Sequence, residues 1–206
     1  MITCPLCSSF SKLFYKNTHY KCECCTGVFK AKEFHLIGED EKNIYEKHKN
    51  NSSDIRYQNF LSPITNSVLN DKPKSSIGLD FGCGKDSAII KVLSDNGYKI
   101  YGYDLFYLDD KSLLEKKYDY ITSSEVIEHF QEPNKEFTLF KSLLKDNGSL
   151  YLMTDIYDES IDFDKWYYKN DPTHIFMYQR KTFEWIKEEF GFSRVEIEGR
   201  LIRFYL

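Results

Sequence analysis

The stretch IGLDFGCGKDSAII, residues 77–90, decides the fold of this 206-residue chain. Its first five residues, Ile77–Phe81, have strand character and lead directly into Gly-Cys-Gly, after which an amphipathic segment begins. A strand that turns sharply into a helix around glycines is typical of nucleotide-binding α/β domains, because glycine lets the backbone approach a ligand closely. The stretch therefore predicts the first strand and helix of such a domain.

Strand and helix signals alternate beyond this stretch. Further strands are predicted at Tyr98–Tyr103, Tyr118–Thr122 and Ser149–Thr154, with apolar residues at helical spacing between them. This alternation predicts an α/β domain with a Rossmann-like, doubly wound and mostly parallel sheet, helices on both faces and Ile77–Phe81 as its middle strand. Residues 193–206, SRVEIEGRLIRFYL, predict a closing antiparallel hairpin.

Five of the six cysteines crowd into positions 4–25. Cys4-Pro-Leu-Cys7 and Cys22-Glu-Cys-Cys25 form two C-x-x-C pairs separated by fourteen residues, a spacing close to that of a zinc ribbon. Two such pairs complete a tetrahedral Zn²⁺ site with no open position, so the metal would be structural. Cys24 is a competing ligand, but Cys25 restores the two-residue gap and is preferred.

The charge and hydropathy of the chain limit which kinds of partner it can bind. The whole chain has a net charge of −4, whereas residues 1–35 carry five lysines and two glutamates, a net +3. This asymmetry permits an anionic partner for the cysteine-rich segment without requiring one. The start of the chain does not follow a signal-peptide pattern and no apolar run reaches membrane-spanning length, so we expect a cytoplasmic protein without membrane contact.

An acidic residue ends the strand that follows the glycine turn. Asp104 lies twenty residues beyond Gly84, where a carboxylate can accept hydrogen bonds from ribose hydroxyls, which fits NAD as well as S-adenosylmethionine (SAM). Asp86 is expected in the first turn of the helix, where its charge would oppose a pyrophosphate. SAM is cationic and carries no phosphate, so carboxylates such as Asp80 and Asp86 favour SAM. Asp86 is equally explained as an ordinary helix-start residue.

Four segments, in this order, resemble the class I SAM-dependent methyltransferases. They are LDFGCG (79–84), GYDLF (102–106), YDYITSSEVIEHFQEP (118–133) and LLKDNGSLYLMT (143–154). With the cysteine pairs ahead of them, the chain resembles bacterial methyltransferases that carry an N-terminal zinc ribbon. With the cysteine spacing and the polar, charged residues 36–53, this predicts three parts, namely a zinc ribbon (1–35), a linker or exposed helix (36–53) and a SAM-binding methyltransferase domain (54–206).

The resemblance also implies roles for particular residues. Gly82 and Gly84 would line the methionine moiety of SAM, and Asp104 would hold its ribose. Ser123, Ser124 and Glu125, just past their strand, would edge the cofactor and substrate pocket.

The chain departs from the family pattern in two places. Asp86 stands where the family has its third glycine, which alters the turn at the methionine end. Only residues 105–117 separate Asp104 from the next strand, so a helix, a strand and a second helix do not fit between them. We therefore expect one strand to be weak or missing, with Asp109 or Asp110 as weak substitutes for the acid that contacts adenine.

An aromatic segment, FDKWYYKNDPTHIFMYQ (163–179), follows the last parallel strand, on the edge where open α/β sheets bind ligands. Trp166, Tyr167 and Tyr178 are candidates for the wall of a substrate pocket, although aromatics at such positions often belong to the core. His174 is the candidate general base, because imidazole titrates near neutral pH. His129 is a second catalytic candidate; a structural role is the alternative for both histidines.

Together these features predict a SAM-dependent methyltransferase that acts on a small-molecule or sugar-like acceptor. One alternative is an RNA methyltransferase that uses the positively charged ribbon to position RNA. A non-catalytic protein that binds SAM or a partner is another, and an NAD-dependent oxidoreductase is a third. No N-P-P-Y-like motif and no Pro-Cys nucleophile is present, which lowers the weight of the nucleic-acid alternative.

Overall fold

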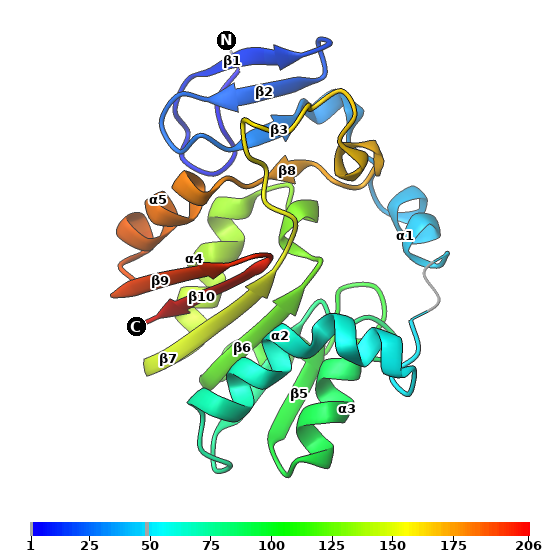
Figure 1. The fold of residues 1–206 in the computed structure, drawn as a ribbon, viewed down its shortest axis with the longest axis vertical. Helices are drawn as coiled ribbons and strands as arrows, with labels where there is room; N and C mark the ends of the chain where they lie inside the picture. The colour runs from blue at the N-terminus through cyan, green and yellow to red at the C-terminus, as the bar shows by residue number, and fades with distance from the viewer. Residues whose placement is uncertain (1, 48–49) are drawn as a thin grey trace.

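A six-stranded sheet forms the centre of the computed structural model, which describes residues 2–47 and 50–206 (Figure 1). In spatial order its strands are β5 (Lys99–Tyr103), β4 (Ile77–Phe81), β6 (Tyr118–Ser124), β7 (Leu144–Met153), β10 (Leu201–Tyr205) and β9 (Arg194–Glu198). The first four are parallel, whereas β10 pairs antiparallel with both β7 and β9. The mostly parallel α/β fold and its closing hairpin are therefore confirmed.

Helices cover both faces of this sheet (Figure 1). Helices α2 (Ile55–Asp71) and α3 (Ala88–Asp95) pack on one face, and α4 (Pro133–Leu143) and α5 (Arg180–Phe190) on the other. The side chains of β6 explain the division, because successive residues of a strand point to opposite faces. Tyr120 joins the cluster under α2 and α3, whereas its neighbour Ile121 joins the cluster under α4 and α5.

The position of β4 differs from the expectation. It lies second from the edge of the sheet, between β5 and β6, and is not the middle strand. The reason is that residues 105–117 form only the 3-10 helix η2 (Lys111–Glu115), so that no strand follows β5 outward in this described segment. The expected loss of a strand is thereby confirmed, and it leaves β5 as the edge.

A second, smaller sheet contains the cysteine-rich segment. Its strands β1 (Ser11–Tyr15), β2 (His19–Cys22) and β3 (Val28–Lys30) are joined by β8 (Phe176–Met177), a strand from the far end of the chain. Strands β3 and β8 pair antiparallel, with Val28 opposite Met177. In Figure 1 β8 accordingly lies directly beneath the blue strands. The ribbon is thus hydrogen-bonded to the segment between β7 and α5.

Residues 36–53 connect the two sheets. The helix α1 (Glu39–Tyr45) forms here, after the short 3-10 helix η1 (Lys32–Phe34), and it has no buried residue. His48 and Lys49, which belong to the expected linker, lie outside the described residues. Across residues 2–47 and 50–206, no helix is both long and apolar enough to cross a membrane.

A close approach in the sheet generates a test of this packing. An added Cβ at Gly78 would lie 2.2 Å from ring atoms of Tyr120 on the neighbouring strand. We expect Gly78→Ala to lower the free energy of unfolding by about 1–3 kcal/mol, measured by urea denaturation, because overpacking forces neighbours to move. In a Tyr120→Ala background the ring is gone, so the same substitution should cost much less. Equal costs in the two backgrounds would contradict the steric explanation.

Candidate active site

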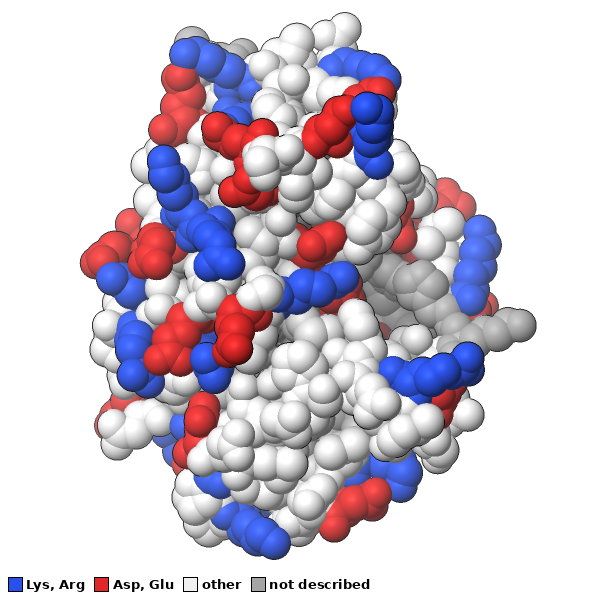
Figure 2. Space-filling model, viewed as in Figure 1, with Lys and Arg blue, Asp and Glu red and all other residues white. Residues whose placement is uncertain are grey.

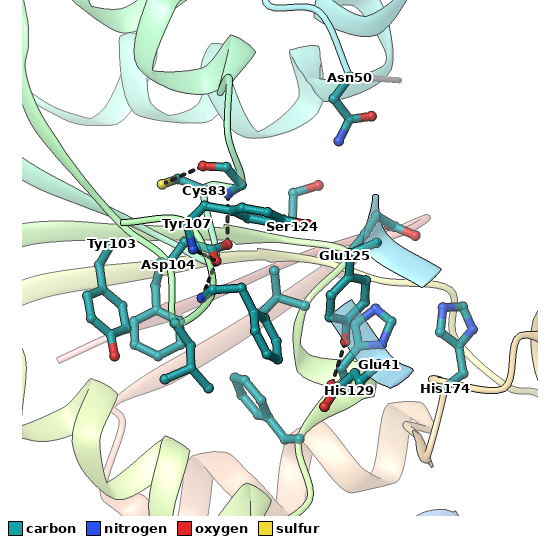
Figure 3. Close-up of a pocket in the computed structure, with 18 of the residues that line it drawn as sticks. Glu41, Asn50, Cys83, Tyr103, Asp104, Tyr107, Ser124, Glu125, His129 and His174 are labelled. Atoms are coloured by element: carbon teal, nitrogen blue, oxygen red, sulfur yellow. Dashed lines mark hydrogen bonds between the residues drawn. The ribbon is translucent and has the colours of Figure 1, made fainter. Parts of the chain in front are cut away.

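A cavity of about 1130 Å³ opens above the carboxyl end of β4 (Figure 3). The chain passes from β4 to β5 on one side and later to β6 on the other, which makes this crevice the topological switch point of the sheet. Open α/β sheets bind their ligands at such a point. The walls come from the β4–α3 turn, the ends of β5 and β6, helices α1 and α2, and residues 167–174. This volume accommodates a nucleoside cofactor together with a small second ligand.

Glycine is required at positions 82 and 84 of the turn for different structural reasons. Both adopt left-handed backbone angles, with φ of 76° at Gly82 and 64° at Gly84. An added Cβ at Gly82 would lie 2.4 Å from the side chain of Val126, so this glycine permits close packing against the end of β6. At Gly84 an added Cβ would meet nothing within 4 Å, and the residue lines the cavity. Gly84 therefore presents bare backbone to a ligand.

Asp104, at the end of β5, holds the turn in place. One of its carboxylate oxygens accepts a hydrogen bond from the Gly84 N–H at 2.9 Å, and the other accepts from the N–H groups of Phe106 and Tyr107 at 2.9 and 3.1 Å. Each carboxylate oxygen has more than one acceptor position, so Asp104 keeps capacity for hydroxyl donors in the cavity. Figure 3 shows its side chain beside the turn.

The acid that replaces the third glycine lies outside the helix. Helix α3 begins at Ala88 with Ser87 as its N-cap, so the expectation that Asp86 occupies the first turn is wrong. The carboxylate of Asp86 instead accepts a hydrogen bond from the Ser52 N–H at 2.9 Å, while the residue lines the cavity. Capping by Ser87 displaces Asp86 toward solvent and toward the segment that precedes α2.

Asp80 lies beneath the turn, not in the cavity. It is 2% exposed and accepts hydrogen bonds from the hydroxyls of Ser87 at 2.6 Å and Thr122 at 2.8 Å. Burial raises the pKa of this carboxyl from 3.8 to about 6. Its expected contact with the cofactor is therefore replaced by a structural role, since it links β4, β6 and the N-cap of α3.

The end of β6 carries a strained acid. Glu125 has a φ of 53°, unusual for a residue other than glycine, and its carboxylate accepts a hydrogen bond from Arg200 at 2.5 Å. Burial, followed by the charge of Glu128, raises the pKa of Glu125 to about 8, although Arg200 opposes the shift. Ser124 and Glu125 line the cavity as expected, whereas Ser123 is fully buried and does not. Strained backbone of this kind is concentrated at functional sites.

The two candidate histidines lie together at the opposite end of the cavity from Asp104 (Figure 3). His129 ends the 3-10 helix η3 (Ile127–His129), and His174 follows the 3-10 helix η4 (Tyr167–Asn170). Their ring centroids are 4.9 Å apart. Burial lowers the pKa of His174, so that its ring is neutral at neutral pH. The sequence-based candidates are thus brought to one wall.

The aromatic candidates divide between cavity and core. Tyr167 lines the cavity and is 63% exposed. Trp166 packs with Tyr157 and Phe163 in a cluster next to the ribbon, and the fully buried Tyr178 donates a hydrogen bond to the Ile127 carbonyl at 3.0 Å. The expectation that Trp166 and Tyr178 wall the substrate pocket is therefore wrong, because packing under the ribbon and α5 turns them inward.

Several residues of the site carried no signal in the sequence. Glu41 and Tyr45 of α1 line the cavity, although their segment reads only as a linker or exposed helix. Arg200 reaches the cavity from the turn between β9 and β10, where it pairs with Glu125. Only the packing of distant segments brings these three residues to the site. Their positions at the site follow from the tertiary structure and could not be predicted from local sequence patterns.

The structure also gathers four cysteine sulfurs. The Sγ atoms of Cys4, Cys7, Cys22 and Cys25 all lie within 4.8 Å of one another. Cys24 is exposed and outside this group, and its backbone N–H donates to the Cys22 sulfur at 3.3 Å. A compact set of four thiols fits the tetrahedral sulfur coordination of zinc. Cys25, not Cys24, belongs to the group, in agreement with the two-residue gap in the sequence.

The sequence model of a family described as "Methyltransferase domain" matches residues 54–197. The chain therefore belongs to this family of methyltransferase domains. No curated protein matches the sequence significantly.

Solved structures of methyltransferases share the fold. Magnesium protoporphyrin IX methyltransferase from Synechocystis PCC 6803, with bound S-adenosylhomocysteine, aligns with a TM-score of 0.54 and 18% identity over 80% of this chain and 91% of its own. A SAM-dependent methyltransferase from Archaeoglobus fulgidus has a TM-score of 0.54 and 20% identity over 68% of this chain and 72% of its own. An O-methyltransferase family protein from Burkholderia thailandensis has a TM-score of 0.51 and 11% identity over 75% of this chain and 60% of its own. This chain therefore spans three fifths of that protein's length.

The buried Asp80 gives a pH-dependent prediction. Because its pKa is raised from 3.8 to about 6, the carboxyl's contribution to stability is present below pH 4 and is lost as the pH rises through about 6. Asp80→Asn cannot ionise, so its stability relative to the wild type should improve between pH 4 and 6, by up to about 3 kcal/mol. Urea unfolding of both proteins from pH 4 to 7.5 measures the difference. A difference that does not change with pH would contradict the assignment.

Proposed function

We propose that the chain is a SAM-dependent methyltransferase that acts on a small-molecule acceptor. The observation that carries this proposal is the cavity at the switch point of a methyltransferase-family domain, where Gly84 offers bare backbone and Asp104 offers a carboxylate. When bound, SAM supplies a sulfonium methyl whose carbon bonds to the acceptor while the C–S bond breaks, its electron pair staying on sulfur. Asp104 would hold the ribose hydroxyls, and Gly82 and Gly84 would leave room for the methionine end.

The charge of the cavity supports a small, uncharged or cationic acceptor over RNA. Among the described residues that line it, the acids are Glu41, Glu46, Asp86, Asp104, Glu125, Glu132, Glu136 and Asp171, and the Lys and Arg residues are Lys85 and Arg200. This balance suits a cationic cofactor and repels a phosphate backbone. On the face seen in Figure 2, Lys and Arg side chains alternate with Asp and Glu and form no continuous basic track.

The acceptor end of the cavity is assigned to the wall that holds His129, His174 and Tyr167. His174 is the proposed catalytic residue, because its imidazole faces the cavity and is held by a rigid Asp-Pro-Thr-His turn. In that turn Asp171 accepts hydrogen bonds from the Thr173 N–H at 2.8 Å and from its hydroxyl at 2.5 Å. Such fixation is what alignment of an acceptor with a methyl group requires.

A first prediction concerns Asp104. Asp104→Ala removes a charged acceptor for ribose hydroxyls, and hydrogen bonds to charged groups contribute about 1.5–3 kcal/mol. We expect the affinity for SAM, measured by calorimetry, to fall about tenfold to a hundredfold. Asp110→Ala is the matched control, because Asp110 follows the same strand but caps η2 outside the cavity, and its SAM affinity should be unchanged. Binding of NAD without binding of SAM would refute the proposed function.

A second prediction concerns the ribbon, for which we propose one structural zinc held by Cys4, Cys7, Cys22 and Cys25. Such a thiolate site fits a reducing cytoplasm. Gently purified protein should contain about one zinc per chain by elemental analysis. Cys7→Ser should remove most of the zinc and lower the melting temperature, because metal binding contributes directly to folding of small metal domains. Cys24→Ser, the control beside the same knuckle, should keep its zinc, and equal loss in both variants would argue against this ligand set.

A further inference from the structure

Three potential ligands from two segments converge at the acceptor end of the cavity. Glu128, His129 and His174 each offer one ligand atom, and these atoms lie within 4.8 Å of one another. Glu128 and His129 are neighbours on η3, whereas His174 comes from the segment between η4 and β8. Figure 3 shows the two imidazoles side by side at the cavity wall.

The hydrogen bonds of the two rings fix which nitrogen would bind a metal. The Nδ1 atom of His174 lies 2.7 Å from the Tyr168 carbonyl oxygen, and that of His129 lies 2.9 Å from the Thr173 carbonyl oxygen. A carbonyl oxygen only accepts, so each Nδ1 carries a proton, and Nε2 is the ring nitrogen that would bind a metal. Histidines that bind metals are held in this way, with the other ring N–H given to a carbonyl.

Glu128 is a buried carboxylate without a fixed cation. Its side chain is fully buried, and it accepts hydrogen bonds from the hydroxyls of Tyr168 and Thr154. Throughout the described chain, no lysine or arginine forms an ion pair with it. The Nε2 atom of His174 lies 3.9 Å from the carboxylate, too far for a hydrogen bond. The lone pair on Nε2 of His174 therefore faces the carboxylate of Glu128, an arrangement that a cation bound between them stabilises.

Further acidic side chains near His174 also favour a bound cation. The carboxylate of Asp171 lies 4.0 Å from the same His174 nitrogen. Glu125 uses one oxygen for Arg200, while its buried Oε1 has no hydrogen-bond partner among the described residues. The Nε2 atom of His174 thus lies within 4.0 Å of two carboxylates, those of Glu128 and Asp171.

We propose that Glu128, His129 and His174 bind one divalent transition-metal cation. Two ligand atoms about 2.0–2.2 Å from a common ion lie up to about 4.4 Å apart, which includes the 3.9 Å between Glu128 and His174. One carboxylate and two imidazoles favour Mn²⁺, Fe²⁺ or Zn²⁺ over Mg²⁺ and Ca²⁺, which prefer oxygen ligands alone. Three protein ligands leave coordination positions open toward the cavity, unlike the four-cysteine site.

The role of this cation toward the acceptor rests on the proposed function; the cation site itself does not. An acceptor that bears a hydroxyl group would fill an open position through its oxygen, and a divalent cation lowers the pKa of a bound hydroxyl. The proton would then leave to water, and the metal-bound oxygen would be the nucleophile. The substrate class that fits is a small hydroxyl-bearing molecule, and His174 would act on it as a metal ligand.

Titration of the zinc-loaded full chain with Mn²⁺, followed by electron paramagnetic resonance, tests the site. Manganese leaves the cysteine site to zinc, because thiolates select the softer ion. We expect one bound Mn²⁺ per chain, with pulsed spectra that show coupling to imidazole nitrogen. Glu128→Gln preserves shape and removes the charge, and it should weaken Mn²⁺ binding at least tenfold. Glu136→Gln, a matched change at another acid of the same cavity, should bind as the wild type does.

Circular dichroism establishes that each variant is folded, and His129→Ala with the nitrogen coupling provides a second test if Glu128→Gln does not fold. Absence of bound Mn²⁺, equal affinity in the two glutamine variants, or binding without nitrogen coupling would each overturn the site. Calorimetry with SAM on the same wild-type sample separates the two proposals. Binding of SAM without Mn²⁺ overturns the cation site and leaves His174 as a direct base, whereas Mn²⁺ binding without SAM refutes only the proposed function.

Discussion

The backbone hydrogen bonds of Ile175 connect the ribbon to the cavity wall that carries His129 and His174. Its N–H donates to the carbonyl of Glu128 at 2.8 Å, and its carbonyl accepts from the N–H of Lys30 at 2.8 Å. One residue therefore connects the ribbon to the 3-10 helix that follows β6. His174 precedes it, so the position of that imidazole depends on both partners. The ribbon and this wall of the cavity are therefore linked through the peptide segment at Ile175.

This link explains why a ribbon accompanies a methyltransferase domain here. The chain from the end of β7 to the start of α5 contains only η4 and the two-residue strand β8, so it has little regular structure of its own. Irregular segments of such length need external contacts to hold one conformation. Pairing with β3 and the aromatic cluster around Trp166 supply those contacts. A zinc-bound ribbon would thus support the wall that carries Tyr167 and His174.

The sequence predicted the fold, and it predicted that Gly82, Gly84 and Asp104 lie together at one site, because local signals specify both. The glycine turn needs positive φ angles, and Asp104 follows its strand at a fixed position, so residue type and spacing were sufficient. The aromatic segment was different. The sequence does not determine whether Trp166 or its neighbour Tyr167 faces the cavity, since that depends on the ribbon packed against them. Arg200 likewise reaches Glu125 only because β10 pairs with β7.

The altered turn shows how a departure from a family pattern is accommodated. A third glycine would leave the backbone open before the helix, whereas Asp86 adds a charge at the rim of the cavity. Because Ser87 caps α3, Asp86 is not required for helix initiation, and its carboxylate binds the backbone of Ser52. That contact ties the chain ahead of α2 to the turn. Since Gly84 retains its open space, the substitution constrains the approach to the cavity without filling the position where the backbone meets a ligand.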